Sequence, residues 1–191
     1  MIFFTDKHIA LVGLPGSGKS TIGRQLARRW SLPFIDADAV IEQRLGSSIR
    51  DFFAQHGEES FRDVEQQVIA GLLGDKRQMV IATGGGAVLR PANRAELGAH
   101  AFVVYLSAAP EEIAKRLHGD TQRPLLQVHN PMQRLLDLHA QRGPLYEEVA
   151  GLVVNEAGRP AVQVAQNVLQ QLERLQKQSE ADGARHANKE N

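Results

Sequence analysis

The sequence contains no cysteine and carries no excess charge of either sign. Without cysteine among its 191 residues, the chain cannot form disulfides, thiolate metal sites or a cysteine nucleophile. Its 22 Lys and Arg residues balance 22 Asp and Glu residues, which argues against non-specific binding to nucleic acid. No apolar run approaches the ~20 residues that span a bilayer, and the N-terminal sequence lacks the features of a secretory signal. We therefore expect a cytoplasmic protein, and a monomer, with neither nucleic-acid nor membrane partners.

Short apolar runs alternate along the chain with segments of helical periodicity. The runs at 8–12, 32–35, 79–82, 101–106 and 151–155 predict strands. Helices are predicted at 20–30, 40–45, 50–55, 58–73, 110–117, 131–141 and 160–176. This alternation favours an α/β fold with a parallel sheet covered on both faces. We expect one domain over residues 1–176, with a polar, irregular lid at about 116–130, and a disordered tail over 177–191, where large apolar residues are absent.

The strongest motif is a phosphate-binding loop between the first strand and the first helix. Residues 13–20 match the pattern G-x-x-x-x-G-K-[ST]. The N–H groups of such a loop point at phosphate, and the following helix presents its positive end. Lys19 would reach the β- and γ-phosphates, and the Ser20 hydroxyl would coordinate Mg²⁺. The residues expected to contact ATP here are Gly13, Leu14, Pro15, Gly16, Ser17, Gly18, Lys19, Ser20 and Thr21.

The loop alone does not identify the phosphate acceptor, because GTPases, motor ATPases and small-molecule kinases share it. The chain is short, lacks an N-K-x-D run that would read guanine, and has arginines near a lid-like segment. These features favour a small-molecule kinase.

Two aspartates, Asp36 and Asp38, follow the second predicted strand. In an open parallel sheet, ligands bind beyond the carboxyl ends of the strands, so both carboxylates should lie near the phosphate loop. Asp36 could hold a water on Mg²⁺, and Asp38 could orient an attacking hydroxyl or take its proton. A helix N-cap is the alternative interpretation, and it explains one aspartate better than two.

Three consecutive glycines, Gly84, Gly85 and Gly86, follow the third predicted strand. Glycine is costly to order and contributes no side-chain contacts, so a run of three indicates that bare backbone is needed there. A flexible turn is the alternative.

Taken in order, these motifs resemble shikimate kinases of the nucleoside-monophosphate-kinase-like P-loop family. The resemblance runs from about residue 8 to 175 and rests on GLPGSGKSTIGR, the paired aspartates, GEESFRDVE, TGGGAV, RPLL and RGPLYEEVA. It implies a three-layer α/β/α fold with a five-stranded parallel sheet and a mobile lid. It also implies transfer of the γ-phosphate of ATP, with Mg²⁺, to the 3-hydroxyl of shikimate.

The resemblance also implies roles for individual residues. Backbone N–H groups at 84–86 would line the shikimate pocket, and Arg62 and Arg142 would bind the shikimate carboxylate. Arg123 corresponds to a lid arginine that closes over the transferring phosphate, and Arg116 to a residue that stacks on adenine. Residues 155–156 depart from the Asp-Thr that the family often has, which leaves the adenine contacts open.

Two alternatives remain at this point. A gluconate-type P-loop kinase would share the phosphate loop and the lid, but has no evident use for three glycines and two carboxylate-binding arginines. A nucleotide-binding regulator without catalysis would be expected to lack some of the reacting residues. Lys19, Ser20, Asp36, Asp38 and Arg123 are all present.

Overall fold

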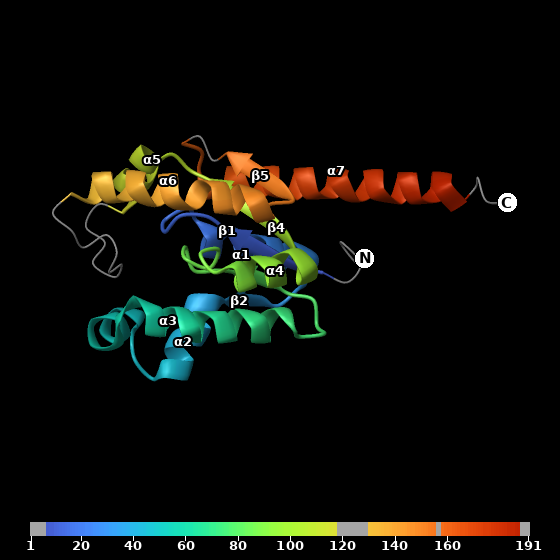
Figure 1. Cartoon of the computed structure of the whole chain (residues 1–191). Coiled ribbons are helices and arrows are strands. Elements are labelled where there is room, and N and C mark those ends of the chain that lie inside the picture. Colours follow the sequence, from blue (N-terminus) through green and yellow to red (C-terminus); the bar gives the residue numbers. More distant parts are fainter. Residues whose placement is uncertain (1–6, 118–129, 156–157, 188–191) are drawn as a thin grey trace.

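The computed structural model describes residues 7–117, 130–155 and 158–187, with side chains described up to residue 178. Its centre is a sheet of five parallel strands in the order β2-β3-β1-β4-β5 (Figure 1). The strands are β1 (His8–Val12), β2 (Phe34–Asp36), β3 (Val80–Ala82), β4 (Ala101–Ser107) and β5 (Leu152–Asn155). The predicted parallel sheet is therefore confirmed.

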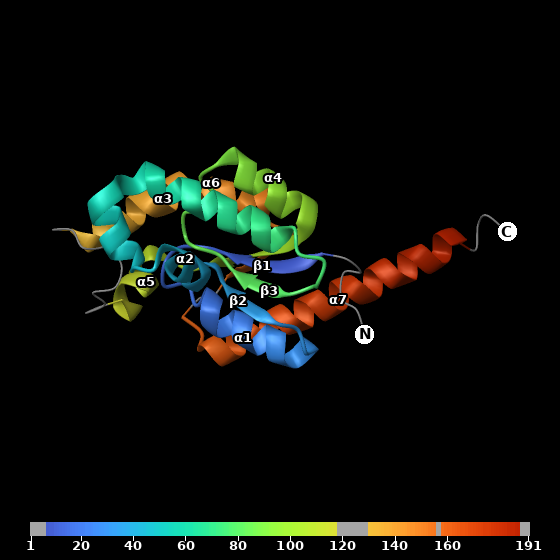
Figure 2. The same cartoon turned by 90° about the horizontal axis from the view of Figure 1, so that it is seen from below.

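Helices cover both faces of this sheet. They are α1 (Lys19–Trp30), α2 (Ala37–Leu45), α3 (Ile49–Leu73), α4 (Pro91–His100), α5 (Pro110–Arg116), α6 (Pro131–Val149) and α7 (Ala161–Ala187). Figure 2 shows α3, α4 and α6 on one face and α1 and α7 on the other. This is the three-layer arrangement expected from the sequence.

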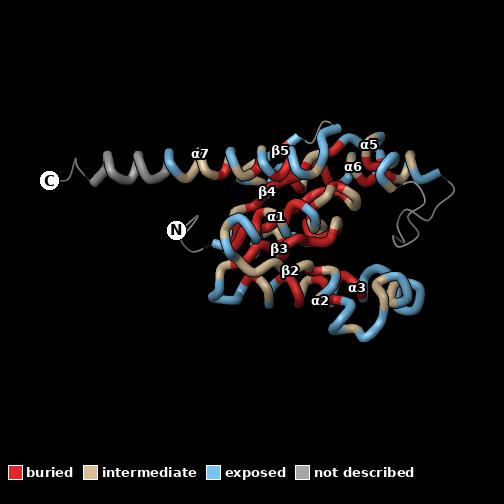
Figure 3. The backbone as a smooth tube through the Cα atoms, turned by 180° about the vertical axis from the view of Figure 1, so that it is seen from behind, coloured by how far each residue is buried: buried red, intermediate tan, exposed pale blue. Residues whose placement is uncertain are grey.

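The central strand β1 shows why the sheet needs cover on both sides. Ile9 and Leu11 belong to the apolar core shared with α1 and α7, whereas Ala10 and Val12 belong to the core shared with α3, α4 and α6. All four are fully buried, and the buried strands lie in the middle of the molecule (Figure 3). Burial of each large side chain contributes about 1.5–3 kcal/mol, so the carboxyl end of β1 is a firm support for the loop that follows.

Two helices differ from the sequence prediction in ways that matter for the site. Helix α4 was not predicted, although Pro91 occupies its first turn, where proline is well tolerated. Helix α6 was predicted to end near 141, but it continues to Val149 with Pro144 inside it. Proline removes one helical hydrogen bond. The burial of Tyr146 in the core offsets that loss and keeps the final turns of α6 in place.

The element α3 contains the break that the sequence predicts, whereas the predicted end of α7 needs correction. Gly57 is not helical (φ 77°, ψ 175°), and it separates the two helices expected at 50–55 and 58–73 within α3. Helix α7 continues to Ala187 rather than ending near 176, so the tail expected from 177 is helical over most of its length. That segment contains no proline and is rich in good helix formers.

Among the described residues, none of the helices combines the length and apolarity needed to cross a bilayer. The segment expected to form the lid lies mostly at 118–129, outside the described residues.

Candidate active site

The phosphate loop links β1 to α1 and binds its own lysine. The Lys19 ammonium is buried and donates hydrogen bonds to the carbonyl oxygens of Gly13 (2.8 Å) and Leu14 (2.9 Å). Gly13 has φ 146°, and a Cβ atom there would lie 2.6 Å from the Leu106 carbonyl oxygen. The loop therefore requires glycine at its first position, and it holds a positive charge where the sequence predicts phosphate.

Ser20 and Asp36 meet at the edge of this loop. The Ser20 hydroxyl donates to Asp36 Oδ2 at 2.5 Å, and Asp36 Oδ1 accepts from the Asp38 backbone N–H at 3.2 Å as the N-cap of α2. The capping interpretation is therefore confirmed for Asp36, which contacts the phosphate loop as well. A hydroxyl beside a carboxylate is a pair of hard oxygen donors, the chemistry that suits Mg²⁺.

The glycine loop, residues 84–86, lies where three elements converge. A Cβ atom on Gly84 would lie 2.8 Å from both Asp38 Oδ1 and Glu65 Oε1, and one on Gly85 would lie 2.8 Å from the Pro15 ring. Bare backbone is thus required by the protein's own side chains. The loop is in contact with α2, α3 and the phosphate loop at once.

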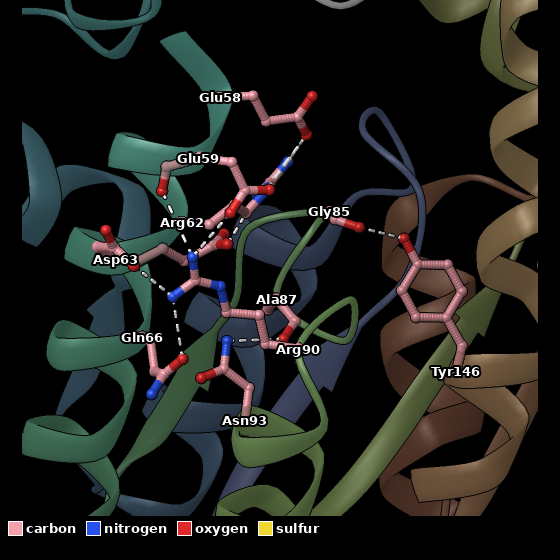
Figure 4. Close-up of polar contacts among 11 residues, drawn as sticks. Glu58, Glu59, Arg62, Asp63, Gln66, Gly85, Ala87, Arg90, Asn93 and Tyr146 are labelled. Atoms are coloured by element: carbon pink, nitrogen blue, oxygen red, sulfur yellow. Dashed lines mark hydrogen bonds and ion pairs between the residues drawn. The ribbon is translucent and has the colours of Figure 1, made fainter. Parts of the chain in front are cut away.

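The third glycine lies against a buried arginine. A Cβ atom on Gly86 would collide with the Arg62 guanidinium. That guanidinium is held by Glu58 (Nη2 to Oε1, 2.8 Å; Figure 4). Glu65 also holds it (Nη1 to Oε2, 2.7 Å), and it lies 5.1 Å from the centre of the Phe61 ring. Burial lowers the pKa of Arg62, but the carboxylates of Glu65 and Glu58 raise it by more. The pKa of Arg62 therefore lies above its ordinary value. Arg62 is therefore a fixed cation facing the glycine loop.

Glu65 is a site residue that the sequence analysis did not identify. Its side chain is buried, and Oε1 has no hydrogen-bond partner among the described residues. Burial raises the pKa of Glu65, the charge of Arg62 opposes this, and the charge of Asp38 adds to the increase. The available signal was its position three residues after Arg62, which places both on one helix face.

Arg142, on α6, is the second buried arginine. Its Nε and Nη1 atoms have no hydrogen-bond partner among the described residues. Burial lowers the pKa of Arg142; Tyr146 opposes this, and the positive charge of Arg62 lowers it further. Two buried guanidinium groups that repel each other, one with vacant N–H groups, form a site that favours an anion.

A second set of contacts fixes the far end of the glycine loop. Asn93, on α4, donates from Nδ2 to the Ala87 carbonyl (2.9 Å), and Arg94 donates to the Val88 carbonyl (2.9 Å). Arg90 forms ion pairs with Asp63 (2.6 Å) and Glu59 (3.2 Å) on α3 (Figure 4). The loop is thus held by α3 and α4, an arrangement that required the helix missed in the sequence.

The remaining expected residues lie around the phosphate loop or outside the described chain. Arg116, at the end of α5, donates to the Gly16 carbonyl at 3.5 Å, so this end of α5 contacts the phosphate loop. Thr21 is exposed in the first turn of α1. Arg123 lies outside the described residues, as does Glu156 beside the expected adenine site.

Comparisons with known proteins agree with this arrangement. A family model described as shikimate kinase matches residues 15–173. The chain is 53% identical over 167 residues to a shikimate kinase from Paracidovorax citrulli, covering 86% of this chain and 91% of the relative. It is also similar to the structure of a shikimate kinase from Acinetobacter baumannii in complex with shikimate, with a TM-score of 0.84, 42% identity, and coverage of 88% and 93% of the two chains.

A more distant structure shares the fold. A gluconokinase from Sinorhizobium meliloti gives a TM-score of 0.60 at 21% identity, covering 93% of this chain and 97% of the other. At that identity the likeness concerns the architecture alone.

Proposed function

The chain belongs to the shikimate kinase family, and from that premise we propose how its site acts. The protein is an ATP-dependent kinase that acts on a hydroxyl group of shikimate. We assign the 3-hydroxyl as acceptor, which gives shikimate 3-phosphate and ADP. This reaction belongs to aromatic amino-acid biosynthesis.

The observation that carries the proposal is the buried, incompletely hydrogen-bonded guanidinium of Arg142. A buried cation with vacant N–H groups is costly unless an anion completes it. A planar carboxylate between Arg142 and Arg62 would supply the missing acceptors, because a guanidinium fork matches a carboxylate bidentately. A hydroxy acid the size of shikimate would then rest on the backbone of residues 84–86.

Asp38 is the group we place at the acceptor hydroxyl. Its carboxylate lies beside Gly84 and on α2, whose N-terminus is joined to Ser20 of the phosphate loop through Asp36. An acceptor seated on the glycine loop would meet Asp38 on one side and the terminal phosphate on the other. Asp38 would accept a hydrogen bond from that hydroxyl, aligning it and receiving its proton as the new P–O bond forms.

Lys19 and Arg123 are assigned to the charge that develops on the transferring phosphate. In the free protein Lys19 bonds to loop carbonyls, and phosphate oxygens would compete for it. Arg123, outside the described residues, is assigned to the same oxygens on closure of residues 116–130. The backbone of 13–20 would bind the other phosphates, and Arg116 would stack on adenine.

Ser20 and Asp36 would hold the Mg²⁺ that accompanies ATP. The Ser20 hydroxyl would bind the ion directly, and Asp36 would hold one of its waters. The fit rests on two oxygen groups 2.5 Å apart, one in the first turn of α1 and one at the N-cap of α2. When bound, Mg²⁺ neutralises charge on the β- and γ-phosphates.

A coupled assay of ADP release tests the proposal directly. With MgATP, shikimate should support steady turnover, whereas gluconate and nucleoside monophosphates should give only background ATP hydrolysis. Mass spectrometry of the product should show one added phosphoryl group. Turnover with gluconate alone would assign the site to a carbohydrate kinase, and ATP binding without ADP formation would favour the regulatory alternative.

We also propose that the enzyme is a monomer in the cytoplasm. Light scattering behind a sizing column should give a mass near 21.0 kDa, and a mass near twice that value would contradict the monomer.

A further inference from the structure

We propose that Tyr146 is a positioning residue, whose hydroxyl ties α6, the helix that carries Arg142, to the backbone of the glycine loop. The inference rests on the proposed function, because it assigns Tyr146 to the carboxylate side of the shikimate pocket. It concerns a residue that would not touch the substrate and would act through two groups that do.

The first support is the hydrogen bond from Tyr146 to the loop. Its hydroxyl donates to the Gly85 carbonyl oxygen at 2.5 Å across 61 residues of sequence (Figure 4). The ring is fully buried and packs on Tyr105 of β4, with ring centres 5.0 Å apart. A ring that is fully buried and packed on Tyr105 cannot swing away, so the hydroxyl is a fixed donor.

The second support is the link from the same hydroxyl to Arg142. The two residues are four apart on α6, hence on the same helix face. Burial raises the pKa of Tyr146, and the positive charge of Arg142 opposes that increase. The Tyr146 hydroxyl therefore lies within the electrostatic reach of the Arg142 guanidinium while it donates to the Gly85 carbonyl.

The consequence for the loop follows from peptide geometry. The carbonyl of Gly85 and the N–H of Gly86 belong to one rigid planar unit and point in opposite directions. Fixing the carbonyl toward α6 therefore fixes the direction of the Gly86 N–H, beside Arg62. One hydroxyl thus sets the orientation of a loop peptide beside Arg62 and joins that peptide to the helix that carries Arg142.

Tyr146→Phe removes only the hydroxyl and leaves the ring. We expect the KM for shikimate to rise by about tenfold, because the Gly85 carbonyl loses its donor and the link between the glycine loop and α6 is broken. The KM for ATP should stay within about twofold of the wild-type value, since the phosphate loop holds Lys19 through its own carbonyls.

Tyr105→Phe is the matched control, because it makes the same chemical change in the neighbouring ring. Tyr105 has no hydrogen bond to the glycine loop within the described part of the chain. Its shikimate KM should stay near wild type. Equal increases in both variants, or a rise in both KM values of Tyr146→Phe, would overturn the proposal in favour of a general packing role.

A double-mutant cycle with Arg142→Met tests whether Tyr146 acts through Arg142. The shikimate KM of the double variant should rise by less than the product of the two single increases. If the shikimate KM of the double variant rose by the product of the two single increases, the residues would act independently. That result would contradict the proposal that Tyr146 acts together with Arg142.

A second replacement of Tyr146 keeps the proposal testable if Tyr146→Phe fails to fold. Tyr146→p-aminophenylalanine keeps a donor at the ring position, so its shikimate KM should remain close to wild type even if Tyr146→Phe unfolds. The proposal would be overturned if this variant raised the shikimate KM as much as Tyr146→Phe does. If Tyr146→Phe unfolds, a rise of about tenfold in the p-aminophenylalanine variant would overturn it. If the wild-type enzyme phosphorylates shikimate and Tyr146→Phe behaves identically, the positioning role fails while the proposed function stands.

Discussion

The phosphate loop and the glycine-loop pocket are neighbours that are built in opposite ways. The phosphate loop is contiguous in sequence, residues 13–20, and its lysine is satisfied by the loop's own carbonyls. The pocket is assembled from α2, α3, α6 and the loop after β3, which lie far apart in the sequence. Within the described residues it keeps buried atoms without partners, on Arg142 and Glu65.

The difference predicts how each region responds to loss of a charged side chain. A ligand in the phosphate loop would replace hydrogen bonds that already exist. Removing Lys19 should therefore lower both the stability of the free protein and the rate of catalysis. In the pocket, a ligand would supply the partner that Arg142 lacks, so removing Arg142 should weaken ligand binding yet stabilise the free protein. Loss of Lys19 should therefore lower the stability of the free protein, whereas loss of Arg142 should raise it.

Asp38→Asn should have the largest effect on turnover. It keeps the shape and the backbone N–H that caps onto Asp36, but it removes the charge that would align the hydroxyl. We expect kcat to fall by about 10²–10⁴, with ATP affinity nearly unchanged by calorimetry. Full turnover in this variant would remove Asp38 from the mechanism.

Lys19→Met should lower kcat by about 10²–10³, the range seen when one donor to developing charge is lost. The variant also leaves the Gly13 and Leu14 carbonyls without their lysine donor. We therefore expect a lower Tm for the ligand-free protein in calorimetry. A ligand-free Tm above the wild-type value would mean that the hydrogen bonds between Lys19 and the loop carbonyls do not stabilise the free protein.

Arg142→Met is the counterpart in the pocket. The shikimate KM should rise by about 10–100-fold through loss of a charged hydrogen-bonding partner. The ligand-free Tm should rise by about 2–4 °C, as expected for relief of about 1 kcal/mol in a chain of this size. An unchanged KM would mean that the carboxylate is held elsewhere, and a lower Tm would show that Arg142 stabilises the free protein.

Glu65→Gln should have the smallest effect, visible as a change in pH dependence. Burial raises the pKa of Glu65 above its ordinary value of 4.5, so the folded state binds this proton more tightly than the unfolded state. Its contribution to stability is full below pH 4.5 and is lost as pH rises through the raised pKa.

The free energy of unfolding of the wild type relative to Glu65→Gln should therefore fall from about pH 4 upward, measured by urea titration at several pH values. Asp63→Asn is the control for loss of a carboxylate on the same helix, because the Asp63 carboxylate is exposed. A parallel pH profile for Glu65→Gln would indicate that Arg62 outweighs burial.

The phosphate loop was the part of the site most fully foreseen from the sequence, because its geometry is encoded in consecutive residues. Asp36, Asp38 and the three glycines were foreseen as candidates from their places after strands. Glu65 and Tyr146 were not, because burial and contacts made across the fold give them their environment. The α6 prediction stopped short of Pro144 for a similar reason, since packing overrides the local cost of proline.

The crowding around residues 84–86 has a consequence for inhibition. A side chain at any of these three positions would collide with Asp38, Glu65, Pro15 or Arg62. An inhibitor that binds mainly to the backbone of residues 84–86 would therefore bind a surface that single substitutions at these positions can hardly change. Escape variants would therefore have to arise at other positions than these three glycines.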